Sequence, residues 1–276
     1  MRIAFTDVDG CRVRYFHEGD GDRVIVLLHG LGISADTWAR NIDVLAKNFR
    51  VIAPDLPGHG FTELPDLKGR AAHPTMVEVV LGLLDQLGIE KFSICGHSYG
   101  ATIAALIYFE RPESIEKLIF NGSHRIFQSR DETVKGFEKS YANAKSAIGN
   151  PSLDTCRQRM GNVCHDPANI PEEVLLIQLT SYAQPTMAAD YEKIARANMD
   201  LELSRPYRCG DRIHEVSIPV LVISGKEDVR VPVADLEAGM KRLQDGELVL
   251  VEKCGHMLQT EHTSLFNKNI LQFLGG

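Results

Sequence analysis

The pattern with the clearest chemical meaning is a serine between two glycines, Gly-His-Ser-Tyr-Gly at residues 96–100. It follows an apolar run at 92–95 and opens a second apolar stretch at 102–109. A strand that turns sharply into a helix through such a sequence exposes the serine hydroxyl, because the small flanking residues let strand and helix cross closely. The helix N-terminus then directs free N–H groups at the reacting centre. This pattern predicts Ser98 as a nucleophile.

A second glycine-rich turn, His-Gly-Leu-Gly at residues 29–32, directly follows the apolar run 24–28. A turn of this kind directs a backbone N–H at the oxyanion that develops during acyl transfer. We predict that the N–H of Leu31 is one donor and that the N–H of Tyr99 is the other. The His29 side chain is interpreted as a brace of the turn rather than as a group that transfers protons.

A serine nucleophile needs a general base, and position must select it among the ten histidines. His256 comes just after the last apolar run, 247–251, and loops at the carboxyl ends of parallel strands are where open α/β sheets hold their chemistry. The acid should follow the preceding run, 220–223, where Asp228 is the predicted residue and Glu227 the alternative. A carboxylate there would hold the histidine tautomer and stabilise the imidazolium. The order Ser, acid, His is typical of this arrangement.

Short β-rich runs alternate with amphipathic stretches along most of the chain. The expected strands cover residues 2–6, 11–17, 24–28, 50–53, 92–95, 117–120, 220–223 and 247–251, and the expected helices cover 35–47, 74–87, 98–110, 233–243 and 262–273. Such alternation indicates βαβ units and a largely parallel sheet. The first two strands meet at Asp9-Gly10, a hairpin signal, so the sheet should begin antiparallel.

The alternation is interrupted at about residues 122–207, which have helical periodicity and no convincing strand. Within this segment, 172–182 and 190–203 are the expected helices. An all-helical insertion between two core strands is interpreted as a cap over the site. We therefore predict a helical cap at 122–207, inserted into a core formed by 1–121 and 208–276.

Four residues are candidate substrate contacts. Gly30 lies in the glycine-rich turn, Trp38 follows it, and His124 and Phe127 lie in the predicted cap. The aromatic residues of the cap either line a pocket or form the core between its helices, and for any single one the core is the favoured interpretation.

Composition bounds the protein class. The 276 residues are 44% hydrophobic and 24% charged, which excludes a disordered, collagen-like or coiled-coil chain. The 30 basic and 37 acidic residues give a net charge of −7, so nucleic acid and anionic membranes are not expected partners. No stretch approaches the ~18 apolar residues of a membrane span, and no signal peptide is recognised. We expect a cytoplasmic protein whose partner is a small-molecule substrate.

No cofactor and no metal are expected. The first strand is not followed by Gly-X-Gly-X-X-Gly, and the chain has no P-loop motif, so nucleotide phosphate has no cradle. The six cysteines form no Cys-X-X-Cys pair, and the His and Cys spacings do not make a zinc site. The sequence does not indicate an oligomeric state.

These motifs together resemble the α/β-hydrolase superfamily, in its compact esterase and lactonase branch. The resemblance covers nearly the whole chain outside the cap and includes the turn 29–32, the segment 51–60, the serine motif, the Asp228 loop and the Gly-His at 255–256. It implies an eight-stranded, mostly parallel sheet flanked by helices, with the helical cap inserted after strand six. The epoxide hydrolases and haloalkane dehalogenases of the superfamily use an Asp nucleophile, and Ser98 argues against both.

The predicted function is a serine hydrolase that cleaves a small-molecule carboxylic ester or lactone through an acyl-enzyme. The alternative among enzymes is a carbon–carbon bond hydrolase of the meta-cleavage type, whose anionic substrates would favour an arginine surplus in the cap. The cap instead mixes both signs: Arg125, Arg157, Arg159, Arg196, Glu172, Glu173, Asp190 and Glu192. The alternative of another class is a hydrolase-like receptor for a small ligand, because such relatives keep the triad.

Overall fold

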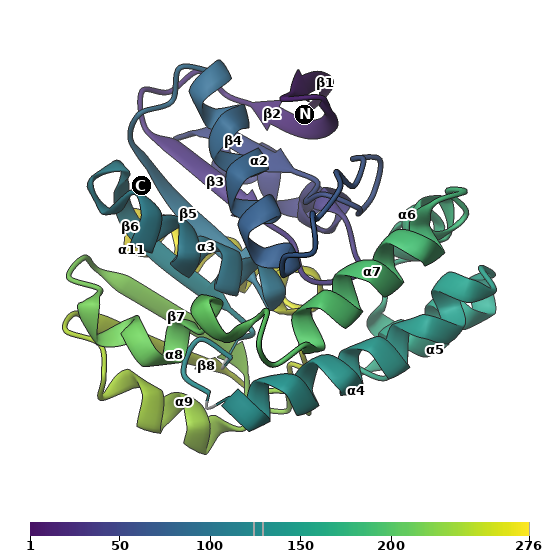
Figure 1. Ribbon diagram of the computed structural model, residues 1–276. Helices are drawn as coiled ribbons and strands as arrows, with labels where there is room; N and C mark the ends of the chain where they lie inside the picture. The colour runs from purple at the N-terminus through teal and green to yellow at the C-terminus, as the bar shows by residue number, and fades with distance from the viewer. Residues whose placement is uncertain (124, 129, 276) are drawn as a thin grey trace.

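An eight-stranded sheet forms the centre of the protein, with the strand order β1-β2-β4-β3-β5-β6-β7-β8 (Figure 1). The computed structural model describes residues 1–123, 125–128 and 130–275. The strands are β1 (Arg2–Val8), β2 (Cys11–Glu18), β3 (Val24–Leu28), β4 (Arg50–Pro54), β5 (Phe92–His97), β6 (Ile115–Asn121), β7 (Val220–Gly225) and β8 (Gly246–Val251). The β1–β2 and β2–β4 pairings are antiparallel and the others are parallel, which confirms the predicted fold class.

The central strands correspond to the continuous apolar runs of the sequence. Every residue of β3, β5 and β7 is buried, because helices cover both faces of a parallel sheet. Strand β1 lies at the edge and is exposed over much of its length. It joins β2 through Asp9 and Gly10, which both have positive φ, 50° and 82°, as the two-residue hairpin signal predicts.

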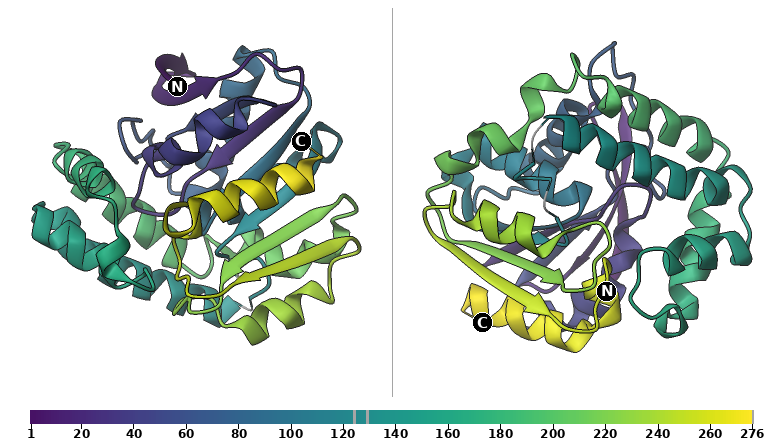
Figure 2. Two further views of the ribbon diagram at one scale, coloured as in Figure 1. Left: turned by 180° about the vertical axis from the view of Figure 1, so that it is seen from behind. Right: turned by 90° about the horizontal axis from the view of Figure 1, so that it is seen from below.

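Helices pack on both faces of the sheet. On one face lie α1 (Ala39–Leu45) and α11 (Thr263–Leu274), and Figure 2 shows α11 crossing the sheet in the view from behind. On the other face lie α2 (Ala72–Gln86), α3 (Tyr99–Glu110), α8 (Cys209–Arg212) and α9 (Val233–Met240). A short helix, α10 (Leu258–Glu261), precedes α11. The two apolar cores are therefore separated by the sheet.

Four of the helices described between β6 and β7 form a group that precedes α8. They are α4 (Arg130–Gly149), α5 (Leu153–Gly161), α6 (Glu172–Tyr182) and α7 (Met187–Met199), and we call them the cap helices. Helix α4 packs against α7, and α5 packs against α6. The group lies beside the carboxyl ends of the parallel strands (Figure 1). The division into core and cap at 121/122 and 207/208 stays a prediction.

The last cap helix differs from its predicted bounds. It begins at Met187 and ends at Met199, whereas the periodicity indicated 190–203. The chain leaves the helix at Asp200, whose carboxylate accepts the N–H groups of Glu202 and Leu203, both at 2.9 Å. A short acidic side chain that bonds nearby backbone N–H groups favours a turn over continued helix. In the described part of the chain, no helix has the length and apolar character needed to cross a membrane.

Candidate active site

Ser98 occupies the sharp turn between β5 and α3. Its φ of 52° lies in the left-handed region, which residues other than glycine rarely adopt. A Cβ built on Gly96 would lie 2.3 Å from the carbonyl oxygen of Gly100, and one built on Gly100 would lie 2.4 Å from that of Leu28. The Ser98 N–H donates to the Asn121 carbonyl at 2.9 Å. Glycine on both sides therefore permits the close crossing that the motif predicted.

His256 and Asp228 meet in a buried hydrogen bond. His256 Nδ1 lies 2.7 Å from Asp228 Oδ2, and the residues are 4% and 6% exposed. The other imidazole nitrogen, Nε2, has no hydrogen-bond partner among the described residues. Ser98 and His256 line the same cavity. The arrangement can pass a proton from a serine hydroxyl to an imidazole that a carboxylate orients.

The structure separates the two candidate acids. Asp228 contacts His256 and also accepts the N–H of Arg230 at 2.8 Å. Glu227 points elsewhere in the same loop, where its Oε2 accepts the N–H of Cys254 at 3.0 Å. Glu227 thus connects the acid loop to the loop that carries the histidine.

The glycine-rich turn lies against the serine. A Cβ on Gly30 would lie 3.2 Å from Cβ of Ser98 and 3.0 Å from Nδ1 of His97, so any larger side chain here would crowd the serine turn. Leu31 follows in the wall of a small cavity that Ser98 also lines. Tyr99 is the first residue of α3. The two residues predicted to supply oxyanion donors therefore lie in the turn after β3 and at the first position of α3, both next to the serine.

The His29 side chain connects this turn to the segment after β4. Its Nδ1 lies 2.8 Å from the Gly30 carbonyl oxygen, and its Nε2 accepts the N–H of Leu56 at 2.8 Å. Burial lowers the pKa of His29 to about 4, so the imidazole is neutral at pH 7, with its proton on Nδ1. These contacts fit the interpretation of His29 as a brace.

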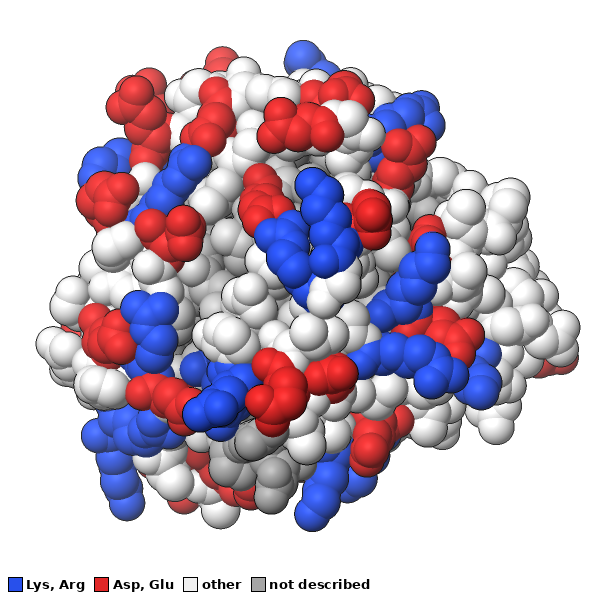
Figure 3. All heavy atoms as spheres, in the orientation of Figure 1, with Lys and Arg blue, Asp and Glu red and all other residues white. Residues whose placement is uncertain are grey.

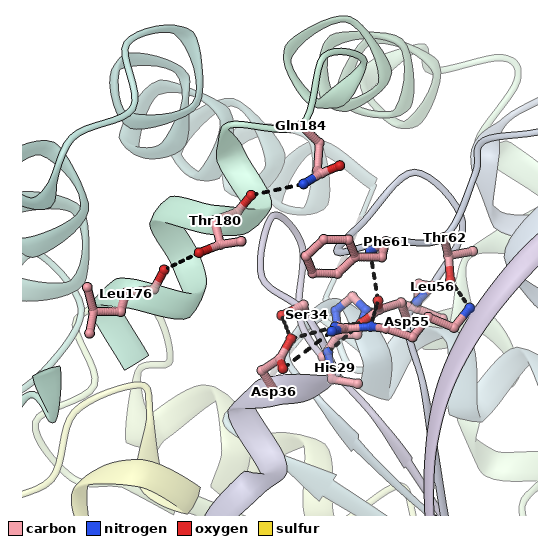
Figure 4. Close-up of polar contacts among 12 residues, drawn as sticks. His29, Ser34, Asp36, Asp55, Leu56, Phe61, Thr62, Leu176, Thr180 and Gln184 are labelled. Atoms are coloured by element: carbon pink, nitrogen blue, oxygen red, sulfur yellow. Dashed lines mark hydrogen bonds and ion pairs between the residues drawn. The ribbon is translucent and has the colours of Figure 1, made fainter. Parts of the chain in front are cut away.

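A buried ionic cluster supports the chain next to the turn (Figure 4). Asp55, fully buried, accepts from Nε of Arg14 at 2.6 Å and from the N–H groups of Ala35 and Phe61 at 2.8 and 2.9 Å. Arg14 also pairs with Asp36. A buried carboxylate that accepts hydrogen bonds from a bidentate arginine and from two amides has all its hydrogen bonds satisfied. Asp55 thereby ties together β2, which carries Arg14, and the segments that carry Ala35 and Phe61.

A cavity of about 240 Å³ opens beside Ser98 and His256. Its other walls come from the segment after β6, from the first half of α4 and from the acid loop. Among the described residues, four Lys or Arg and two Asp or Glu side chains line it: Arg125, Lys135, Lys139, Arg230, Glu132 and Asp235. A second cavity, of about 30 Å³, lies on the Gly30 side of Ser98 and is lined in part by Arg159 and Met257.

The arginines of these cavities bond to uncharged groups. Arg125 Nη2 donates to the Gly136 carbonyl at 2.6 Å and to Ser140 Oγ at 2.7 Å. Arg230 Nη1 reaches Ser140 Oγ at 3.3 Å. Among the described residues, no carboxylate forms an ion pair with the guanidinium of Arg125, Arg159 or Arg230. Burial lowers the pKa of Arg125 and Arg159 to about 10, which leaves both charged at pH 7.

Two of the candidate substrate contacts lie away from the cavities. Trp38 is fully buried, and its ring centroid lies 5.8 Å from that of Phe266 in the core on the α11 face. Phe127 packs on α9, where a Cβ on Gly239 would lie 2.2 Å from Cγ of the ring. Trp38 is thus part of the apolar core and Phe127 is half-buried against α9, and neither lines the two cavities beside Ser98. That they contact the substrate stays a prediction. His124 lies outside the described residues.

Several residues of the site were not predicted from the sequence. Arg230 comes two residues after Asp228, so its position in the acid loop is a signal that could have identified it. Ser140 and Arg125 carry no comparable signal, because the fold alone brings α4 and the segment after β6 to the cavity. In the described part of the chain, no group of three His, Cys, Asp or Glu side chains could hold a metal ion.

Comparisons with known proteins identify the family of the fold. A family model described as "alpha/beta hydrolase fold" matches residues 23–263. The chain is 30% identical to a 2-hydroxy-6-oxononadienedioate/2-hydroxy-6-oxononatrienedioate hydrolase of Paraburkholderia phymatum, over 96% of this chain and 91% of that protein. The structure of a 2-hydroxy-6-oxo-6-phenylhexa-2,4-dienoate hydrolase from Rhodococcus sp. strain RHA1 matches with a TM-score of 0.81 and 26% identity over 100% of both chains. An enol-lactonase from Burkholderia xenovorans LB400 shares the fold, with a TM-score of 0.79 and 23% identity over 99% of this chain and 100% of that one.

Proposed function

The chain belongs to the alpha/beta hydrolase fold family, and we propose that it works as a serine hydrolase with Ser98, His256 and Asp228 as its catalytic triad. His256 Nε2 takes the proton of the Ser98 hydroxyl while Oγ attacks a substrate carbonyl carbon. The Leu31 and Tyr99 N–H groups stabilise the resulting oxyanion. The 2.7 Å contact between Nδ1 and Asp228 keeps the histidine in the tautomer that this step needs.

The acyl-enzyme is then hydrolysed. His256 gives its proton to the departing group, and the bond between that group and the carbonyl carbon breaks. A water molecule next loses a proton to Nε2 and attacks the acyl carbon, which releases the acid and restores the Ser98 hydroxyl. The net reaction adds one water across the cleaved bond. The same steps serve an ester, a lactone or a carbon–carbon bond next to a ketone, so the substrate must be inferred from the cavity.

We propose that the substrate is an anion and that a carbon–carbon bond next to a carbonyl is cleaved. The observation that carries this proposal is the pair of guanidinium groups, Arg125 and Arg230, in the wall of the cavity beside Ser98. A partly buried cation without a carboxylate partner is unfavourable unless a bound anion pairs with it. The Paraburkholderia relative, a dioate hydrolase by name, acts on a substrate with two carboxylates, which supports the same choice.

The distribution of charge in the cap also supports an anionic substrate. A count of the cap residues is balanced, but their positions are not. Arg159 is 7% exposed and Arg125 faces the cavity, whereas Arg157, Glu172 and Glu173 lie on the outside. The arginine surplus expected for a carbon–carbon bond hydrolase is therefore present inside the molecule, although the sequence total hides it.

The test compares two substrates in matched variants. A 2-hydroxy-6-oxo dienedioate and a neutral ester of similar length are given to the wild type and to Arg125→Gln, Arg230→Gln and Arg196→Gln. Arg196 pairs with Glu192 on the exterior and serves as the control. Loss of a charged hydrogen bond should lower kcat/KM for the dianion by about 10- to 100-fold in the first two variants. The neutral ester should be affected much less.

The alternatives give different results in the same experiment. If the wild type prefers the neutral ester or a lactone, and if Arg125→Gln and Arg230→Gln lower both activities equally, the ester or lactone prediction is the correct one. If the protein binds these compounds but completes no more than one turnover, it is a hydrolase-like receptor. Steady multiple turnover of the dianion excludes the receptor.

A further inference from the structure

Two cap helices bond directly to the backbone that carries a proposed oxyanion donor. Arg159 of α5 donates from Nη1 to the Gly32 carbonyl at 2.7 Å and from Nη2 to the Leu31 carbonyl at 3.2 Å. Tyr182 at the end of α6 donates its hydroxyl to the same Gly32 carbonyl at 2.6 Å. Arg159 and Tyr182 are 7% and 2% exposed. Both side chains are thus buried on the turn rather than directed to solvent.

The absence of a side chain at Gly32 leaves room for the cap side chains next to the turn. Gly32 has a φ of 68°, and a Cβ there would lie 2.8 Å from Cε2 of Tyr191 on α7 and 2.9 Å from Nη2 of Arg159. Helix α6 also packs against η1 (Ala35–Trp38), the next element along the chain (Figure 4). Three cap helices therefore contact a segment that belongs to the sheet core.

The Leu31 N–H lies between a contact from the core and a contact from the cap. It shares a peptide plane with the Gly30 carbonyl, which bonds to His29 at 2.8 Å. Because the two groups of a trans peptide point in opposite directions, that bond directs the Leu31 N–H. The carbonyl of Leu31 itself belongs to the next peptide, and Arg159 holds it. The core thus fixes one side of the donor and the cap fixes the other.

The end of α5 also contacts the loop of the proposed base. The His256 N–H donates to the Val163 carbonyl at 2.7 Å, and a Cβ on Gly255 would lie 2.5 Å from that oxygen. The segment Arg159 to Val163 consequently contacts both the oxyanion turn and the histidine loop. Movement of α5 would alter both halves of the machinery together.

We propose that Arg159 is a positioning residue, which acts through the Leu31 N–H and completes the oxyanion site by holding the carbonyls of the glycine-rich turn. The inference rests on the proposed function, because it assigns Arg159 a part in forming the oxyanion. It differs from direct binding of the substrate, since both Nη atoms of Arg159 are bonded to backbone carbonyls. Only Nε is buried without a partner among the described residues.

The test uses a small, uncharged substrate, whose turnover needs the oxyanion site but not the binding of a large or anionic group in the cavity. The enzyme is given 4-nitrophenyl acetate, and kcat and KM are measured for the wild type, Arg159→Ala, Arg159→Lys and Tyr182→Phe. Arg157→Ala is the matched control, because Arg157 lies on the exposed side of the same helix. We expect Arg159→Ala to lower kcat by about 10- to 100-fold with KM within about 2-fold, since a misplaced donor costs transition-state binding.

The conservative variants and an oxyanion-forming inhibitor separate positioning from a general structural role. Lysine can reach one carbonyl but not both, so Arg159→Lys should recover part of kcat. Tyr182→Phe removes one donor and should lower kcat about 3- to 10-fold. A trifluoromethyl ketone, which forms an oxyanion on Ser98, should lose affinity in parallel with kcat in every variant. Unchanged melting temperatures in Arg159→Lys and Tyr182→Phe keep the test valid even if Arg159→Ala does not fold.

Two outcomes would overturn the proposal. In the first, the folded variants keep kcat for 4-nitrophenyl acetate within about 2-fold of the wild type. In the second, the acetate is unaffected and only KM for the dianionic substrate rises, which makes Arg159 a substrate ligand. A different result would show that the proposed function itself is wrong: Ser98→Ala would then hydrolyse the acetate as fast as the wild type.

Discussion

At the scale of single residues, the proposed reaction depends on which nitrogen of each buried histidine carries the proton. His29 donates from Nδ1 to the Gly30 carbonyl, and His97 donates from Nε2 to the His256 carbonyl at 2.9 Å. His256 donates from Nδ1 to Asp228. These oxygen acceptors thus set all three tautomers. Nε2 of His256 is consequently available as a proton acceptor on the cavity side.

Replacing the proposed nucleophile gives the most direct test at this scale. Ser98→Ala should lower hydrolysis by several orders of magnitude, because only binding and the oxyanion donors remain. A fluorophosphonate should label the wild type at Ser98, as checked by mass spectrometry of the digested protein. Ser146→Ala, at an exposed position of α4, should keep full activity and labelling. Wild-type turnover in Ser98→Ala would refute the assignment.

The acid can be tested with a pair of neighbouring isosteres. Asp228→Asn should keep the fold and lower kcat by up to ~10⁴, because the amide favours the wrong tautomer of His256. Glu227→Gln should have a mild effect, since Glu227 bonds the Cys254 N–H and not the imidazole. Steady-state kinetics and melting temperatures of the two variants decide the matter. The reverse order of effects would identify Glu227 as the acid.

At the scale of elements, α4 provides the charged wall of the cavity entrance. Lys135 and Lys139 are one turn apart, and both line the cavity while remaining exposed. Of the cap aromatics, Phe137, Tyr182 and Tyr191 are buried, with 1%, 2% and 1% exposure, whereas Phe127 and Tyr141 are half-buried. The described cavity wall is therefore polar on its cap side.

The two lysines should attract an anionic substrate. Lys135→Gln and Lys139→Gln should each lower kcat/KM for the dianion about 2- to 5-fold at low salt and make it less dependent on ionic strength, because exposed charges act at long range and are screened. Lys145→Gln, on the same helix outside the cavity wall, is the control. Kinetics between low and high salt measure the effect. If kcat/KM for the dianion stays as dependent on salt in the variant that carries both Lys135→Gln and Lys139→Gln, the charges that attract the substrate lie elsewhere.

At the scale of the whole molecule, charge is sorted between the exterior and the interior. On the face shown in Figure 3, Lys and Arg side chains lie beside Asp and Glu. Exterior ion pairs include Arg70–Glu78 and Arg111–Asp85, at 2.7 and 2.6 Å. The guanidinium groups of the cavities lack such partners among the described residues. A chain with a net charge of −7 therefore has more basic than acidic residues in the described lining of the cavity beside Ser98.

The buried histidines make stability dependent on pH. Burial lowers the pKa of His29 to about 4 and the pKa values of His59 and His73 to about 3, and it lowers the pKa of His97 well below its usual value. In the unfolded chain these groups titrate near ~6.5. Below that pH the unfolded state takes up protons that the native state does not. The free energy of unfolding should therefore fall as pH decreases from ~6.5 towards the folded-state values, by up to ~1.4 kcal/mol per pH unit for each histidine.

Urea unfolding between pH 8 and pH 5 measures this effect before most carboxylates titrate. His59→Gln should reduce the slope between pH 6 and pH 5 by about one proton. His214→Gln, at an exposed position, should leave the slope unchanged. An unfolding free energy that is the same at pH 8 and pH 5 would contradict the prediction.

Local sequence was sufficient for the strands, for the serine turn and for the contact between His29 and its turn. In each case the signal and the structure lie within a few residues of each other: apolar runs form the buried strands, and small residues flank Ser98 because β5 and α3 cross there. The predicted C-terminal end of α7, at residue 203, was wrong, because the helix ends at Met199. The carboxylate of Asp200 competes with helical hydrogen bonding, and periodicity does not register it.

Tertiary structure decided where side chains go when their partners are distant in the chain. Trp38 follows the glycine-rich turn but packs on Phe266, more than two hundred residues away. Arg159 reaches the Leu31 carbonyl across a separation of 128 residues, which no local pattern encodes. The charges of the cap appeared balanced as a list of residues, because direction relative to the cavity is a property of the folded backbone. That direction places the arginines beside the cavity, and it is the reason why we propose an anionic substrate rather than a neutral ester.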